Sequence, residues 1–390
     1  MEYGFDEDWT FVGFHPDGYS STDHYFRDKK SEIFEVRALS EAGAEIFNGS
    51  TAWVTGLYYK QEQEDLLRQY TFLSNDFTSS FDSDNIAAFA QFDSQLNRQL
   101  SLTTGLRLEQ RNADYFDSNQ VDFKTDDTLV GGKVVLSYQM DDNNLFYASI
   151  NRGYKAGGAN TDGSLPSNLR EFSPEYLWNY EVGYKVNLLD NEAYIRSALF
   201  YMDRKDVQIS TSLSELREDG STEFISYLGN AATGTNVGIE LEAGWQITSE
   251  LEIYGAIGLL DTEFDGFIAA DGSDKSGDEQ AHAPSYQFNI GLNYQLSDHW
   301  FVNVSVDGKD EFLFSDSHQE KSEAYEIVNM SLSYEKDDWQ VNLWARNLFD
   351  KDYTTRGFFF GNDPRDGYTA KGYTQLAEPA VFGATFDYNF

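Results

Sequence analysis

The sequence predicts an all-β protein, a transmembrane antiparallel β-barrel of about 16 strands. Three observations favour this class. Apolar and polar residues alternate over many segments, tight turns alternate with long polar loops, and aromatic residues make up 16% of the 390 residues. The chain contains no run of about 18 apolar residues, which excludes a membrane-spanning helix. A barrel strand needs only every second residue to be apolar, so the sequence is compatible with a membrane-spanning β-barrel.

The alternation is clearest in residues 286–296, where every even position is aliphatic or aromatic and every odd position is Gln, Asn or Gly. Segments 100–111 and 236–246 alternate in a similar way. A period of two is the side-chain period of a β-strand with one apolar face. The opposite face carries charges such as Arg107 and Glu109 at strand centres. Such charges are costly in a dry core but suit a wet or plugged lumen.

Sixteen strands are predicted, joined alternately by tight turns and long polar loops. The strands are 3–14, 31–40, 50–60, 84–95, 99–111, 128–139, 144–155, 174–188, 192–209, 236–247, 250–264, 284–295, 299–309, 324–334, 338–360 and 380–390. The long loops are roughly 15–30, 61–83, 112–127, 156–173, 210–235, 265–283, 310–323 and 361–378. The 6 prolines all lie in these loops or at the strand ends beside them. Proline cannot donate to a sheet ladder, so this placement supports the strand assignment.

Composition excludes several functions. The chain has 28 Lys+Arg against 66 Asp+Glu, a net charge of −38 that opposes binding to nucleic acid. It has no cysteine, which removes disulfides, thiolate metal sites and a cysteine nucleophile. No catalytic constellation stands out, so we expect neither an enzyme nor a bound cofactor.

The main alternative to a membrane barrel is a soluble β-propeller or solenoid. A propeller repeats a blade motif every 40–50 residues or so, and no such repeat is present. Aromatic residues instead gather at strand ends and along apolar faces, as Tyr176, Trp178, Tyr180 and Tyr184 do. This distribution is typical of the aromatic girdles around a lipid-facing band.

The last predicted strand, 380–390, places Phe382, Phe386, Tyr388 and Phe390 on one face. This pattern resembles the C-terminal signal of bacterial outer-membrane proteins, with Phe386, Tyr388 and Phe390 as the insertion signal. The resemblance implies insertion by the barrel assembly machinery into the outer membrane of a Gram-negative bacterium, surrounded by outer-membrane lipid. If the C-terminus is periplasmic, counting strands backwards places every long loop outside the cell.

Four segments resemble elements of TonB-dependent outer-membrane receptors, in the same order along the chain. They are residues 151–158 (NRGYKAGG), 174–185 (PEYLWNYEVGYK), 200–208 (FYMDRKDVQ) and 347–353 (NLFDKDY). The last looks like the NLFDKxY element near the C-terminus of these receptors. The resemblance extends over the whole chain.

The resemblance implies uptake of a scarce large solute, most often a ferric siderophore, although relatives also carry cobalamin, haem or oligosaccharides. Energy comes from the TonB complex, which pulls on a plug domain. Family barrels have 22 strands, so residues 1–390 are expected to be a partial barrel domain without the plug, the TonB-contacting segment or the first strands. The lack of a signal peptide agrees with this expectation. Such a fragment is not expected to transport alone. Segment 3–14 is expected to be an open edge or to pair with 380–390.

Two alternatives to a receptor remain open at this point. A general porin for passive diffusion also has 16 strands and a terminal Phe, and it closes without a plug. No porin would be expected to resemble the four receptor segments, however. An outer-membrane enzyme such as a protease or lipase is the third class.

Candidate substrate contacts are cations and aromatic rings at the outer strand ends and in the loops. They are Arg152, Tyr154, Lys155, Arg170, Trp178, Arg356, Phe358 and Phe360. Cations suit an anionic ferric chelate, and rings can stack on it. For each residue the alternative is loop stabilisation.

The other residues that could bind haem or a metal ion are predicted to lie in solvated loops or turns. The histidines are His15, His24, His282, His299 and His318, of which four are predicted in outer loops and His299 in a tight turn. Solvation is favoured over haem capture for all of them. Loop 261–279 is acidic, but Lys275 stands where a calcium site would need an oxygen ligand. No metal site is therefore predicted.

Overall fold

A computed structural model describes residues 2–8, 20–70, 73–160, 165–216, 222–268, 272–316, 318–360, 367 and 369–389. Within these ranges, sixteen strands form one sheet in which every neighbouring pair is antiparallel. In spatial order the strands are β1 (Glu2–Asp8), β2 (Ser20–Leu39), β3 (Thr51–Tyr70), β4 (Phe77–Gln95), β5 (Leu100–Asp117), β6 (Asp122–Asp141), β7 (Asn144–Lys155), β10 (Glu175–Leu188), β11 (Ala193–Leu216), β12 (Thr222–Gln246), β13 (Leu251–Asp265), β14 (Tyr286–Ser297), β15 (Trp300–Lys309), β16 (Tyr325–Lys336), β17 (Trp339–Arg346) and β20 (Val381–Tyr388). The predicted class and strand number are confirmed.

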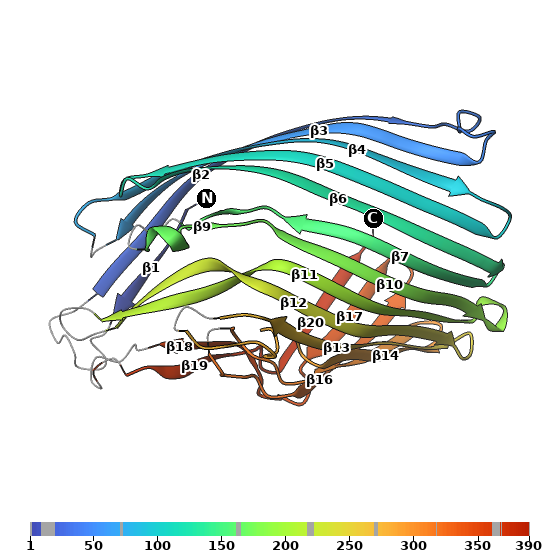
Figure 1. The fold of residues 1–390 in the computed structure, drawn as a ribbon. Coiled ribbons are helices and arrows are strands. Elements are labelled where there is room, and N and C mark those ends of the chain that lie inside the picture. The colour runs from blue at the N-terminus through green and yellow to red at the C-terminus, as the bar shows by residue number, and fades with distance from the viewer. Residues whose placement is uncertain are drawn as a thin grey trace.

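The sheet is strongly curved, with β2–β6 along one side and β17 and β20 behind the middle strands (Figure 1). Tight turns gather at one end of the sheet and long loops at the other. The described residues pair β1 only with β2 and β20 only with β17. Segment 3–14 was expected either to be an open edge or to pair with 380–390. Glu2–Asp8 does not pair with β20 in the described part of the chain. Residues 9–14 lie outside the described part.

Smaller elements occupy the connections between the long strands. The short pairs are β8 (Gly158–Ala159) with β9 (Glu171–Phe172), and β18 (Thr354–Phe360) with β19 (Lys371–Leu376). Two 3-10 turns, η2 (Ser167–Leu169) and η3 (Leu189–Asn191), complete the described elements. None of the helical segments in the described ranges has the length and hydropathy to span a membrane.

The prediction of one strand over 338–360 is wrong. β17 ends at Arg346, and the chain then turns through Asn347 and Asp350, both of which have positive φ. The Asn347 side chain stabilises this turn, because its Oδ1 accepts from the Lys351 N–H at 2.9 Å and its Nδ2 donates to the Lys351 carbonyl at 2.9 Å. An Asn that bonds nearby backbone competes with a strand ladder, so β18 starts a separate hairpin.

Several predicted loops are in fact strand. The ladder of β2 and β3 continues to Asp23↔Tyr70, and the ladder of β11 and β12 continues to Leu216↔Thr222. His24, predicted in a loop, therefore lies in β2. In these extensions apolar residues are scattered among polar ones, and Leu66 and Leu67 are adjacent, so strict alternation is lost. The alternation pattern therefore does not predict these parts of the strands. Backbone ladder bonds do not depend on side-chain polarity, and the strands continue.

The apolar face of the sheet is exposed on the outside. One row crosses five strands in register, from Leu136 through Ala148, Val182 and Leu199 to Ile239. The four large side chains of this row are 42–52% exposed, which no soluble protein of this size would leave uncovered over a whole sheet. The terminal strand shares this face through Phe382, Phe386 and Tyr388, whereas Phe390 lies outside the described residues.

The apolar band has a sharp boundary toward the long loops. Leu108 and Val130 pair in register on the outer face, and both belong to the band. The next outer pair in the same direction is Gln110 and Thr128, joined by a hydrogen bond of 2.7 Å. A change from aliphatic to hydrogen-bonded polar side chains within one row marks the position where lipid would give way to water.

The inner face is a network of polar side chains. Glu109 accepts hydrogen bonds from Arg107 (2.6 and 2.8 Å), Asn85 (2.7 Å) and Tyr154 (2.9 Å). Further along, the Tyr147 hydroxyl donates to Glu181 at 2.6 Å. These charges therefore have partners, as burial of charge requires, and the predicted polar inner face is confirmed.

Candidate functional site

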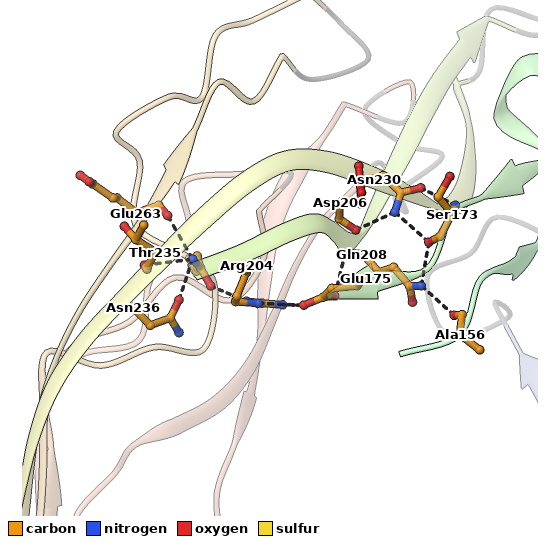
Figure 2. A network of polar contacts seen from close by, with 11 residues as sticks. Ala156, Ser173, Glu175, Arg204, Asp206, Gln208, Asn230, Thr235, Asn236 and Glu263 are labelled. Atoms are coloured by element: carbon orange, nitrogen blue, oxygen red, sulfur yellow. Dashed lines mark hydrogen bonds and ion pairs between the residues drawn. The ribbon is translucent and has the colours of Figure 1, made fainter. Parts of the chain in front are cut away.

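The long loops are fixed to the sheet by the network in Figure 2. Glu175, at the start of β10, is 8% exposed and accepts two hydrogen bonds from Arg204 of β11, at 2.8 and 2.6 Å. Its second oxygen accepts the backbone N–H of Gln208 at 2.9 Å. Arg204 also donates to the side-chain oxygen of Gln280, in the loop after β13, at 2.7 Å. One buried ion pair thus connects three segments that are distant in sequence.

Gln280 holds the loop between β13 and β14 over the inner face. Its side-chain NH₂ donates to Asn236 Oδ1 and to the Glu263 carbonyl, both at 3.1 Å, and its backbone N–H donates to Thr262 Oγ1 at 3.1 Å. Below this loop lies a small apolar cluster of buried side chains. Its members are Val207, Ile209, Phe264 and Phe267.

Gln208 and Asn230 hold the loop between β7 and β10 (Figure 2). Gln208 donates to the carbonyls of Ala156 (2.8 Å) and Ser173 (3.1 Å). Asn230 donates to Ser173 (3.0 Å) and to Asp206 (2.7 Å). Asp206 has φ 53° and is skipped in the β11–β12 ladder, although the register is the same on both sides of it. Its carbonyl is free of the ladder and accepts the hydrogen bond from Asn230.

A pocket of about 580 Å³, here called the rim pocket, opens among these anchored loops. Four parts of the chain contribute: β11 with β12, the loop after β13, the loop after β15, and β18. Its lining residues are Ser210, Thr211, Ser226, Ala281, His282, Phe314, Ser315, Asp316, His318, Arg356, Gly357, Phe358 and Phe359. It combines one cation, aromatic rings and two imidazoles in a concave site, which is the usual composition of a ligand pocket.

Backbone contacts hold the loops of the rim pocket together. The His282 N–H donates to the Leu313 carbonyl at 2.9 Å, and the Ala281 N–H donates to Asp316 Oδ1 at 2.8 Å. The ring of Phe314 lies so close to Gly357 that any Cβ at this position would overlap it. Glycine in β18 therefore allows the loop after β15 to pack against the β18–β19 hairpin.

Burial shifts two titratable groups in the rim pocket toward their neutral forms. The pKa of Asp316 is raised by burial, and the hydrogen bond from the Ala281 N–H opposes this only in part. The pKa of His318 is lowered by burial, and the carboxylate of Glu320 opposes this only in part. The His318 ring lies 6.1 Å from the ring of Phe359.

The structure separates the eight predicted substrate contacts. Arg356 and Phe358 line the rim pocket, and the Phe360 side chain lies outside the described residues. Arg170 donates from Nε to the Leu165 carbonyl at 3.0 Å, within the loop after β7. Lys155 is exposed at the end of β7, in register with Glu175.

The other three candidates lie on the two faces of the sheet. Tyr154 belongs to the inner network, where it contacts Arg107 and Glu109. Arg152 and Trp178 pair in register on the apolar outer face. Sequence reasoning missed the grouping of His282, Asp316 and His318 with Arg356. These residues come from two separate loops and from β18, and no spacing signal connects them.

The acidic loop after β13 is hydrogen-bonded within itself. Asp274 accepts the N–H and hydroxyl of Ser276 at 2.9 and 2.6 Å, and Asp278 lies 3.7 Å from Lys275. Among the residues the structure describes, no group of three or more His, Asp or Glu side chains has the geometry to hold a metal ion.

Comparison with known proteins identifies the family. The family model described as "TonB dependent receptor-like, beta-barrel" matches residues 2–348. The chain belongs to the TonB-dependent receptor family. These receptors are transporters of the Gram-negative outer membrane and not enzymes, so membership decides against the porin and enzyme alternatives.

Two relatives are similar to this chain over part of their length. The chain is 22% identical over 347 residues to the pesticin receptor of Yersinia pestis, and the match covers 85% of this chain and 48% of that protein. It is 23% identical over 234 residues to the metal-pseudopaline receptor CntO of Pseudomonas aeruginosa, covering 58% of this chain and 30% of that protein. The receptor barrel thus spans half or less of the length of these relatives.

Solved structures agree on the fold. The ferric yersiniabactin uptake receptor FyuA from Yersinia pestis superposes with a TM-score of 0.77 at 20% identity, over 95% of this chain and 55% of that one. The siderophore receptor PiuA from Acinetobacter baumannii gives a TM-score of 0.71 at 15% identity, over 94% and 60%. The receptor barrel therefore has the strand arrangement of this family's barrels.

Proposed function

We propose that this receptor barrel takes up an anionic metal chelate, with ferric siderophores as the first class to test. The observation that carries the proposal is the rim pocket, where Arg356 stands beside Phe358 and Phe359. The chain as a whole carries a net charge of −38, which repels anions. Arg356 is the arginine among the lining residues of this pocket, so its guanidinium is the natural place for an anion to bind.

The chemistry of the rim pocket suits such a chelate. A guanidinium forms two parallel hydrogen bonds with carboxylate or catecholate oxygens. Phe358 and Phe359 are 47% and 43% exposed, and their rings offer flat apolar surface to a ligand ring. Burial lowers the pKa of His318, so its imidazole is neutral near pH 7 and can accept as well as donate. The names of the metal-pseudopaline receptor and the ferric yersiniabactin uptake receptor support this substrate class.

The orientation is part of the same proposal. The rim pocket faces the cell exterior, the tight turns and the C-terminus face the periplasm, and the apolar band contacts outer-membrane lipid. The barrel assembly machinery inserts the chain by its C-terminal aromatic face. Active uptake then needs a plug and a TonB-contacting segment, because the TonB complex works by pulling on them.

Binding measurements test the pocket. Quenching of tryptophan fluorescence in detergent micelles would follow an anionic ferric catecholate and a neutral ferric hydroxamate. We expect Arg356→Ala to weaken catecholate binding at least about tenfold, the value of a charge-assisted hydrogen bond, and to leave the hydroxamate unchanged. Phe358→Ala should weaken both. Arg346→Ala, which removes an exposed arginine outside the pocket, is the matched control. Unchanged catecholate affinity in Arg356→Ala would contradict the proposal.

Uptake measurements test the requirement for a plug. The 390 residues expressed alone in a receptor-deleted strain are expected to bind the chelate at the cell surface without accumulating it. Energy-dependent accumulation by this chain alone would overturn that part of the proposal.

A further inference from the structure

The outer face of the sheet holds an apolar groove of about 510 Å³ in the middle of β6, β7, β10, β11 and β12. Two consecutive cross-strand rows form it. The first row is Val134, Ile150, Tyr180, Tyr201 and Val237, and the second contains Leu136, Ala148, Val182 and Leu199. Ala148 is the smallest member of the second row, so the surface is hollowed at the centre and bordered by large side chains.

The end of this groove toward the long loops carries a cation. The next row on the same face places Gly132, Arg152, Trp178 and Asp203 in register. The guanidinium of Arg152 lies 4.2 Å from the centre of the Tyr176 ring and 5.9 Å from that of Trp178. Cation–π contacts with two rings hold an arginine in place at a membrane interface and leave N–H groups for an anion.

The charges around Arg152 leave a net positive site. Its Nη1 donates to the Val130 carbonyl, and among the described residues no carboxylate pairs with this guanidinium. The neighbouring carboxylate, Asp203, lies 3.9 Å from the ammonium of Lys205 on the same face. Two cations and one carboxylate therefore meet at the point where the apolar groove ends, in a chain whose net charge is −38.

We propose that this surface binds one phosphate-bearing lipid of the surrounding bilayer. An acyl chain lies in the groove over Ala148, and the lipid phosphate binds the guanidinium of Arg152. The occupant follows from charge complementarity: an aliphatic groove in a lipid-facing band accepts an acyl chain, and a cation at its end selects an anionic headgroup. A substrate entering through the loops would not reach this face, so the site is separate from the rim pocket.

Native mass spectrometry of the protein released from micelles tests this site. The probes are phosphatidylglycerol and, with equal acyl chains, zwitterionic phosphatidylcholine. The unmodified protein is expected to retain one phosphatidylglycerol in preference to phosphatidylcholine. Arg152→Gln should lower that occupancy about fivefold, the usual effect of one cation near a membrane surface. Lys124→Gln, which removes an exposed cation at the same end of the sheet, should have no effect.

A second variant keeps the test decisive if Arg152→Gln does not fold. Ala148→Phe fills the groove with a side chain that points to lipid, so folding should be retained while phosphatidylglycerol is lost. Equal retention of both lipids by the unmodified protein would overturn the proposal. Retention of phosphatidylglycerol at the unmodified level in Ala148→Phe would overturn it as well.

Discussion

The buried ion pair between Glu175 and Arg204 gives the most demanding test of how the loops are held. Replacing Arg204 with Met keeps the length of the side chain and removes both hydrogen bonds to Glu175, at 2.8 and 2.6 Å, together with the one to Gln280, at 2.7 Å. Glu175 is 8% exposed and would keep only the Gln208 N–H as a partner. Removing one partner of a fully buried pair costs about 3–5 kcal/mol. Because the Arg204 side chain is 25% exposed, we expect the lower value, about 3 kcal/mol.

The assay is the free energy of unfolding in micelles, measured with guanidinium chloride, with limited proteolysis of the loop between β13 and β14 as a local readout. Arg346→Met is the matched control. Its pair with Glu378 has a similar N–O distance of 2.7 Å, but its side chains are 55% and 43% exposed, so the expected cost is below about 1 kcal/mol. Equal losses of stability in the two variants, with unchanged proteolysis of the loop in Arg204→Met, would refute the argument from burial.

Three further outcomes are expected. Leu199→Arg, in the lipid-facing row, should lower the free energy of unfolding by about 2–4 kcal/mol. Asp203→Arg, beyond the apolar band, should lower it by only about 0–1 kcal/mol. Equal losses in the two variants would show that the band does not face lipid. Gly183→Val should cost about 1–3 kcal/mol through overlap with the Tyr147 ring, and unfolding measurements that show no loss would contradict this packing. Burial lowers the pKa of His318 from 6.5, so the stability provided by its neutral form is present above pH 6.5 and is lost as the pH falls through the folded value. Burial raises the pKa of Asp316 from 3.8, so the stability provided by its protonated form is present below pH 3.8 and is lost as the pH rises. When the pH falls below 6.5, the loop after β15 should lose less protection against hydrogen exchange in His318→Gln than in the unmodified protein. The same dependence of exchange on pH in both proteins would contradict this role of His318.

Much of the sheet was predictable because lipid imposes a rule on sequence. Where one face of a strand meets lipid, every second residue must be apolar, and the row through Leu136 and Leu199 obeys it. Beyond Gln110 and Thr128 the outer face carries charged residues such as Asp114 and Lys124, which pair at 3.1 Å. The apolar alternation therefore stops before the strands do, and the predicted strands are too short. The break after Arg346 was missed because it depends on the hydrogen bonds of one side chain, that of Asn347.

The rim pocket was predictable only in part. Residue type and position predict Arg356 and Phe358 as substrate contacts, and both line this pocket. The same reasoning predicts their neighbours His282 and His318 to be solvated loop residues. Trp178 illustrates the reverse case, since its residue type suits both a girdle and a ligand contact. Its register with Arg152 on the apolar face is what favours the girdle.

The sequence by itself determined the period of the strands, the number of strands in the sheet and the family to which the chain belongs. These properties are local or nearly so, because they follow from alternation along a strand and from short motifs. Tertiary structure decided which loops meet, where the buried pair of Glu175 and Arg204 lies, and which face Arg152 occupies. These three features depend on the register between strands and on how the loops pack together. A shift of one residue in register would move every side chain to the other face without changing a single letter of the sequence.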